Sequence, residues 1–167
     1  MFRKIEDFEN AWDYCSECTR KVFDKLTDES LSQSVANDHR NLGRMAWHIV
    51  QTLPEMAGHT GLKVEGPTPT DPVPGTVDEI KKAYDKAAST LLDSIKSGWD
   101  DSTLLQTDNL YGEVWPRGMT LSAMINHEIH HRGQMTVLMR QAGLPVPGTF
   151  GPSKEEWKNW GQEEPQI

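Results

Sequence analysis

The distribution of apolar residues predicts two long helices in the first part of the chain. Over roughly 4–26, apolar side chains recur at intervals of three, four and seven residues, as they do on one face of an α-helix. A second segment, roughly 39–60, shows the same periodicity and contains Pro54. Because proline lacks the amide hydrogen that an internal helical residue donates, this second helix is expected to kink at Pro54 or to end near Leu53.

Two more helices are predicted further along the chain. Thr76 and Glu79 form a T-x-x-E capping box at the start of the third helix, and Gly98 is its expected C-terminal stop. The fourth helix is expected to run from an N-cap at Thr120 to Gly143. Four helices of this kind predict an all-α protein that folds as an antiparallel four-helix bundle.

The segments outside the helices have distinct characters. The Pro-rich run VEGPTPTDPVPG (64–75) is interpreted as either a functional cover or a spacer that spans the bundle. Residues 99–119, before the last long helix, are expected to form a short irregular hairpin. The stretch 144–167 is expected to be a C-terminal extension packed on the bundle, in which a capping box of Ser153 and Glu156 starts one short helix.

Length and charge limit the range of functions. A chain of 167 residues is long enough to bury a core of its own, so we expect one domain over 1–167. The net charge of −8 argues against binding to the nucleic-acid backbone, which requires clustered basic residues. No apolar run reaches the length of about 18 residues that a membrane span needs, and no secretory signal is evident. We therefore expect a cytoplasmic protein with no nucleic-acid or membrane partner.

The two cysteines form a C-x-x-C pair, Cys15 and Cys18. Such a pair is found in redox motifs and in zinc half-sites, but the chain has no second pair to complete a zinc site. Cys15 lies on the apolar face of the first helix and Cys18 on the flank of that face. Both are interpreted as ordinary helix cysteines, because a free cysteine behaves as a small hydrophobic residue.

Three histidines are candidate metal ligands. His127 and His131 lie four residues apart, so their imidazoles project from the same side of the last long helix. His48 lies at the rim of the apolar face of the second helix, and bundles build metal sites from facing helices. Together they predict a three-histidine site with an open coordination position for one divalent transition metal per chain. Three imidazoles suit zinc, nickel, copper or iron, and of these zinc or nickel is favoured. The alternative is a partly buried, hydrogen-bonded histidine pair. Exposed positions are expected for the other histidines, His39, His59 and His130.

The same stretch also matches the H-E-x-x-H pattern of zinc peptidases. In that interpretation Glu128 is a candidate catalytic base that activates a metal-bound water. However, Gln134 stands where the longer form of the motif has glycine, and no convincing strand precedes the helix to hold an extended peptide. Glu128 is also expected to form an exposed i, i+4 ion pair with Arg132. The peptidase interpretation is therefore the less favoured one.

The segments LGRMAWHIVQTLPEM and MTLSAMINHEIHHRGQMTVLMRQAGLPVP resemble the DinB-like (damage-inducible) metal-binding family over about 5–150. The resemblance implies that His48, His127 and His131 bind a divalent metal at one end of the bundle. It also implies an up-down-down-up order of helices, with the Pro-rich connection joining parallel neighbours. Because members of the family are commonly homodimers, it implies a homodimer as well.

The resemblance suggests chemistry at the site, since characterised relatives include metal-dependent transferases that use low-molecular-weight thiols and a thiol-dependent maleylpyruvate isomerase. We expect a metal-dependent transferase or hydrolase acting on a small molecule, with such a thiol as a candidate substrate, because a metal with an open position lowers the pKa of a bound thiol or water. The alternative is a non-catalytic bundle that binds a metal or a small ligand. Arg44 or Arg132 could meet an anionic substrate group, although a solvated helix face is the favoured interpretation of each.

Overall fold

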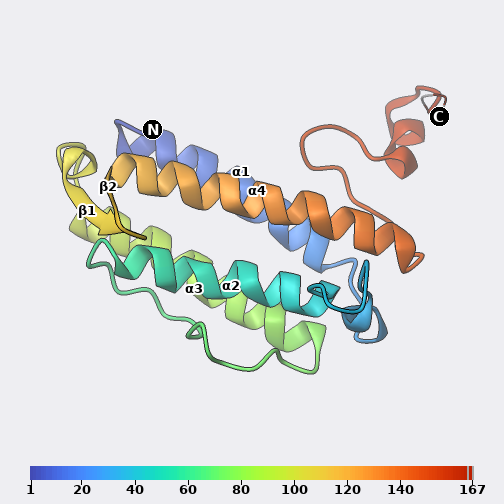
Figure 1. The fold of residues 1–167 in the computed structure, drawn as a ribbon. Helices are drawn as coiled ribbons and strands as arrows, with labels where there is room; N and C mark the ends of the chain where they lie inside the picture. The colour runs from blue at the N-terminus through green and yellow to red at the C-terminus, as the bar shows by residue number, and fades with distance from the viewer. Residues whose placement is uncertain (165, 167) are drawn as a thin grey trace.

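The computed structural model describes residues 1–164 and 166 and shows the predicted helical bundle (Figure 1). Its long helices are α1 (Ile5–Phe23), α2 (Leu42–Gly58), α3 (Val77–Gly98) and α4 (Arg117–Gln141). A two-stranded antiparallel hairpin, β1 (Thr107–Leu110) and β2 (Glu113–Pro116), precedes α4 and confirms the expected hairpin. Short 3₁₀ helices lie at η1 (Glu29–Ser32), η2 (Thr103–Leu105) and η3 (Lys154–Trp160).

The helices follow the up-down-down-up order. Figure 1 shows α2 and α3 running in the same direction, with α1 and α4 running the opposite way. The Pro-rich segment 64–75 passes along the length of the bundle to connect the end of α2 with the start of α3 (Figure 1). A connection between parallel neighbours must cover this distance, so the segment spans the bundle, as the spacer interpretation expects.

The predicted apolar faces form the core. Phe8, Trp12 and Cys15 of α1 are buried, and so are Tyr84 and Leu91 of α3. These side chains lie at three-, four- and seven-residue intervals, so each helix turns one apolar face to the centre of the bundle. Burial of apolar surface of this kind supplies most of the free energy that favours folding, about 25 cal/mol for each Å² removed from water.

The ends of α3 agree with its capping signals. The Thr76 hydroxyl oxygen accepts a hydrogen bond from the backbone N–H of Glu79 at 3.4 Å, which satisfies one of the free donors in the first turn. The helix ends at Gly98, as expected.

Of the two alternatives for the second helix, an end near Leu53 is wrong, because α2 continues through Pro54 to Gly58. Proline removes one backbone hydrogen bond, but packing of the following turn compensates for that loss. Met56 and Ala57 are buried in the core beyond the proline. Tertiary burial therefore maintains a helix that local propensity alone would have ended.

The fourth helix begins earlier than the predicted Thr120 N-cap, with Pro116 in the N-cap position. The hairpin is responsible, because it leads directly into the helix. Arg117 donates its backbone N–H to the carbonyl of Gln106 at 2.8 Å, and its side chain pairs with Asp108 at 2.8 Å. These contacts hold the first turn of α4 against the strands, so the helix starts without a side-chain cap at Thr120.

The C-terminal extension contacts the bundle, and its Val146 is buried in the hydrophobic core. Tyr14 of α1 donates its hydroxyl to the carbonyl of Thr149 and packs edge-to-face against Phe150, with ring centroids 5.4 Å apart. Arg140 of α4 pairs with Glu155 of η3. The Glu156 carboxylate accepts the backbone N–H of Ser153, in agreement with the predicted capping box. Residues 165 and 167 of the predicted extension lie outside the described residues.

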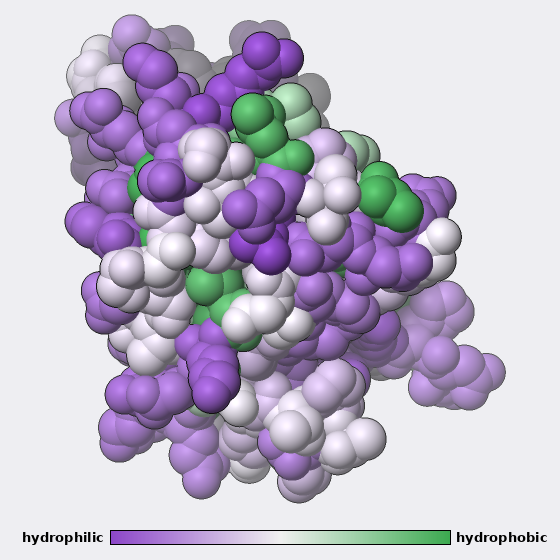
Figure 2. Space-filling view, turned by 90° about the vertical axis from the view of Figure 1, so that its left-hand side faces the viewer, coloured by the Kyte–Doolittle hydropathy of each residue, from purple (hydrophilic) through white to green (hydrophobic). Residues whose placement is uncertain are grey.

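The hairpin end of the molecule carries exposed apolar side chains, including Leu105 and Val114. Figure 2 faces this end and shows apolar residues in small, separate groups among hydrophilic ones. This face therefore offers no continuous apolar surface. Among the described helices, none combines the length and apolar character needed to cross a bilayer.

Candidate metal centre

The structure brings His48 of α2 together with His127 and His131 of α4. Each offers a ring nitrogen, and these atoms all lie within 4.8 Å of one another. The ring centroids are 4.4 to 4.9 Å apart. Side chains from two helices that are far apart in sequence therefore meet at one place, and this three-histidine group could hold a metal ion.

A hydrogen bond to Gln134 sets the tautomer of His131. Its Nδ1 lies 2.7 Å from the amide oxygen of Gln134, which can only accept, so Nδ1 carries the proton. Its Nε2 then has a free lone pair and lies 3.1 Å from Nε2 of His127. Two nitrogens bound tetrahedrally to zinc at about 2.0–2.1 Å would lie about 3.3–3.4 Å apart, which is close to this spacing.

The protonation state of the histidines also suits a metal. Burial lowers the pKa of all three, and the positive charge of Arg40 adds to the effect. The pKa of His48 falls to about 3 and that of His127 to about 4. All three imidazoles are therefore neutral near pH 7, the form that binds metals. Nδ1 of His127 is buried without a hydrogen-bond partner in the described part of the chain.

A pocket of about 540 Å³ opens beside the histidines, and both His48 and His127 form part of its wall. The other lining residues come from α2, the hairpin, α4 and the loop segments: Arg40, Arg44, Gln51, Thr52, Glu55, Met56, Pro69, Tyr111, Trp115 and Ala123. A second pocket of about 380 Å³ lies on the side of His131 and Gln134. Arg40 lines both pockets.

The remaining histidines lie at exposed positions, as expected. His130 is on α4, one residue from His131, but it is not part of the convergent group. His39 lines the second pocket. His59 lies 3.5 Å from Glu55 at the end of α2.

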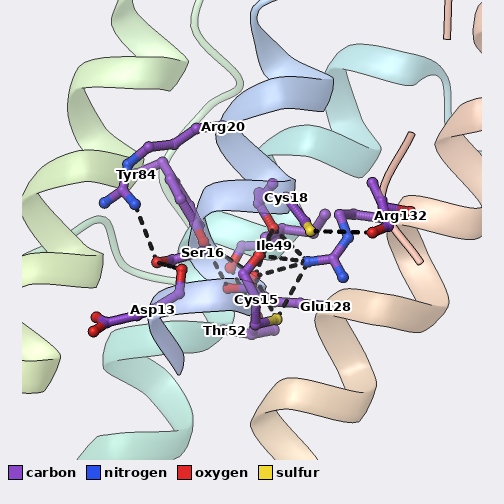
Figure 3. A network of polar contacts seen from close by, with 12 residues as sticks. Asp13, Cys15, Ser16, Cys18, Arg20, Ile49, Thr52, Tyr84, Glu128 and Arg132 are labelled. Atoms are coloured by element: carbon purple, nitrogen blue, oxygen red, sulfur yellow. Dashed lines mark hydrogen bonds and ion pairs between the residues drawn. The ribbon is translucent and has the colours of Figure 1, made fainter. Parts of the chain in front are cut away.

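Glu128 and Arg132 do pair as predicted, at 3.7 Å, but the expectation of an exposed pair is wrong. Glu128 is fully buried and Arg132 is 3% exposed, so the solvated position favoured for Arg132 is also wrong. The Glu128 carboxylate accepts a hydrogen bond from Tyr84 at 3.0 Å (Figure 3). It accepts another from Thr19 at 2.7 Å. The glutamate thus faces α1 and α3, whereas the neighbouring His127 lines the pocket beside α2.

Arg132 completes this buried network. Its Nη1 donates to the Cys15 carbonyl at 2.8 Å (Figure 3). The same nitrogen donates to the Thr19 hydroxyl at 2.8 Å. Its Nη2 is buried without a hydrogen-bond partner in the described residues. Burial raises the pKa of Glu128, and the hydrogen bond from Thr19 and the charge of Arg132 oppose that rise. The network links three helices through paired and hydrogen-bonded groups, the arrangement that a buried charge requires.

The cysteines are free and buried, in agreement with their interpretation as helix cysteines. The Cys15 thiol lies 3.6 Å from Glu128 and 3.2 Å from Arg132. Burial, followed by the charge of Glu128, raises the pKa of Cys15 to about 12. Because the thiolate is the reactive form of cysteine, this thiol is chemically inert near neutral pH.

Several residues of the site escaped the sequence analysis. Arg40 and Gln51 were not singled out, and neither were the hairpin residues Tyr111 and Trp115. A signal existed for the α2 side, since Arg40 and Arg44 precede His48 at intervals of four residues. No local pattern connects the hairpin with α2, because only the fold brings them to one pocket.

The lowered histidine pKa values predict how the stability of the metal-free chain depends on pH. As pH falls below about 6.5, the unfolded chain takes up protons at these positions before the folded chain does. The stability that depends on neutral imidazoles is therefore fully present above about pH 6.5. It is lost as pH falls toward the lower histidine pKa values of the folded state. We expect chelator-treated wild type to lose more stability between pH 7 and pH 4 than His127→Gln does. Denaturant melts would measure the free energy of unfolding of both proteins across this pH range. An equal loss of stability in the two proteins would contradict the prediction.

An up-down-down-up four-helix bundle with a three-histidine cluster between α2 and α4 defines a class of helical bundles with a candidate metal centre. The chain belongs to the DinB family, whose sequence model matches residues 1–165. It is 41% identical over 167 residues to the uncharacterized protein YrdA of Bacillus subtilis strain 168, and the match covers 100% of both chains.

Two solved structures resemble the chain. The crystal structure of a DinB-like protein from Bacillus cereus is 47% identical, has a TM-score of 0.87, and matches 90% of this chain and 100% of that chain. The DinB-like protein YjoA of Bacillus subtilis is 16% identical, has a TM-score of 0.66, and matches 86% of this chain and 97% of that chain. The second likeness shows the fold alone, and the first agrees with the family membership.

Proposed function

We propose that the chain binds one divalent transition metal, zinc or nickel, through His48, His127 and His131. The support is their convergence within 4.8 Å in neutral form. In the described part of the chain, no further histidine, cysteine or carboxylate joins this group. Three protein ligands with no fourth are typical of catalytic zinc sites, which keep one position for water or substrate.

We further propose that the site serves a metal-dependent transferase or hydrolase that acts on a small molecule, with a low-molecular-weight thiol as the preferred substrate class. A metal in this position supplies a lowered pKa for a bound thiol or water. The observation that carries the proposal is the pocket of about 540 Å³ that opens onto His48 and His127, because pockets of this size accept small molecules. Its walls would orient the substrate and restrict the access of water.

The second candidate is a non-catalytic bundle that binds a metal or small ligand. One observation favours it, since the pocket offers no carboxylate free to act as a base. Glu55 accepts hydrogen bonds from the Tyr111 hydroxyl at 2.8 and 3.0 Å. Glu128 is engaged in the core, so we assign it a structural role, and its catalytic role in a peptidase is not supported. A homodimer and a cytoplasmic location stay predictions.

A thiol titration of the cobalt-loaded protein tests the proposed function. With Co²⁺ bound by the histidines, added cysteine should enter the open position and change the visible spectrum through thiolate coordination. Serine, which differs only in its hydroxyl, should not produce this change. A spectrum that stays the same at millimolar cysteine would contradict a thiol-accessible position, and cobalt that fails to bind at all would contradict the metal site itself.

A further inference from the structure

Two arginines without a carboxylate partner lie beside the histidine cluster. Four of the seven arginines in the chain form ion pairs, namely Arg20, Arg117, Arg132 and Arg140. Within the described residues, Arg3, Arg40 and Arg44 have no carboxylate within 4.0 Å. Arg40 and Arg44 line the pocket that opens onto His48 and His127. In a chain with a net charge of −8, this placement concentrates uncompensated positive charge at one small pocket.

Arg44 is held in place by a buried amide. Its Nη1 donates to Oε1 of Gln51 at 2.6 Å. The Gln51 amide nitrogen donates in turn to the carbonyls of Thr68 at 2.6 Å and Asp71 at 3.1 Å, both in the Pro-rich segment. Trp47 donates to the same Asp71 carbonyl at 3.2 Å. The partner of Arg44 is thus neutral, so the guanidinium is oriented while its charge remains available to a ligand.

The one acidic residue in the wall does not cancel this charge. Glu55 accepts hydrogen bonds from the Tyr111 hydroxyl and lies 3.5 Å from His59. Within the described residues it forms no ion pair with an arginine. The rest of the pocket includes the aromatic side chains of Tyr111 and Trp115 from the hairpin. One part of the pocket is therefore positively charged, and another offers flat apolar surface for the body of a ligand.

We infer that Arg40 and Arg44 bind an oxyanion, a carboxylate or a phosphate, on the small molecule that reacts at the histidine cluster. The inference rests on the proposed function and adds the substrate class to it. Guanidinium groups donate paired hydrogen bonds that match the oxygen atoms of carboxylates and phosphates. Beside the metal ligands, this contact fixes one end of the substrate and presents the other end to the open position.

Calorimetric titration with matched aromatic probes tests the inference. Benzoate and phenyl phosphate carry the two oxyanions, and benzamide is the neutral counterpart of benzoate. We expect benzoate or phenyl phosphate to bind the zinc-loaded wild type more tightly than benzamide, and to lose about tenfold or more in affinity in Arg40→Gln and in Arg44→Gln. The preferred probe identifies the kind of oxyanion. Arg3→Gln, which removes an unpaired arginine outside the pocket, should bind like wild type.

The same titrations on chelator-treated protein separate this inference from the metal proposal. Arg44 is placed by its contact with Gln51, so the affinity ratio of wild type to Arg44→Gln should persist without metal. Metal content measured on each variant should match wild type. Equal oxyanion affinities in wild type and both arginine variants would overturn the inference, because the anion would then bind through the metal alone. Equal binding of benzamide and benzoate, or no binding of either oxyanion at millimolar concentration, would overturn it as well.

Discussion

Replacement of Glu128 by alanine is expected to lower the free energy of unfolding by about 3–5 kcal/mol, the usual effect of removing one partner from a buried ion pair. The variant would leave the Arg132 guanidinium buried without a carboxylate. It would also remove the acceptor of the hydrogen bonds from Thr19 and Tyr84. Denaturant melts of the two proteins at pH 7 would measure the difference.

Matched controls separate this effect from a general loss of an i, i+4 pair. Glu17 and Lys21 form a pair with the same spacing and order at 2.7 Å, but on the exposed surface of α1. Glu17→Ala should leave stability nearly unchanged, because solvent screens such pairs. Replacing Glu128 with leucine and Arg132 with methionine together should cost much less than Glu128→Ala, since no unpaired charge is then buried. A Glu128→Ala variant as stable as Glu17→Ala would contradict the structural role of the network.

Replacement of His131 by alanine is expected to abolish stoichiometric metal binding. The change removes one of three proposed ligands, so the affinity loss should exceed the factor of about 10–100 that follows from removing an outer partner of a metal ligand. Metal at about 100 times its dissociation constant would stabilise wild type by about 2.7 kcal/mol through mass action. That stabilisation should be absent in His131→Ala. Elemental analysis together with thermal melts, with and without chelator, provides the measurement.

His130→Ala is the matched control for the metal prediction. His130 lies on the same helix, one residue away, and its side chain is exposed and outside the convergent group. Its replacement should leave about one metal per chain and the full stabilisation by metal. Equal metal content in wild type and His131→Ala would show that the metal is bound elsewhere.

Two pairs of residues on α4 constrain the rotation of this helix about its axis. His127 and His131 face the pocket and α2, whereas Glu128 and Arg132 face α1 and α3. Each pair has i, i+4 spacing, and the pairs are offset by one residue. A rotation of α4 that displaced one pair would displace the other, so the buried ion pair also constrains the orientation of the two histidines.

The helical bundle could be predicted from the sequence because most of its helices obey simple rules. The apolar faces of α1 and α3 are regular, and the capping box at Thr76 and the stop at Gly98 mark the ends of α3. The sequence also indicated the three histidines, since an i, i+4 pair on one helix and a rim histidine on another define faces that can meet. Those local signals were sufficient because each depends on spacing within one helix.

Tertiary structure alone decided the rest. Pro54 lies inside α2 because burial of the following turn outweighs its local penalty, and α4 begins at Arg117 because the hairpin holds its first turn. Arg132 is buried because residues from α1 supply hydrogen-bond acceptors for it, information that the sequence of α4 does not contain. On the surface, water hydrates a charged residue. In a core, the same residue is stable only when partners from other segments form hydrogen bonds and ion pairs with it, so its burial depends on the whole fold.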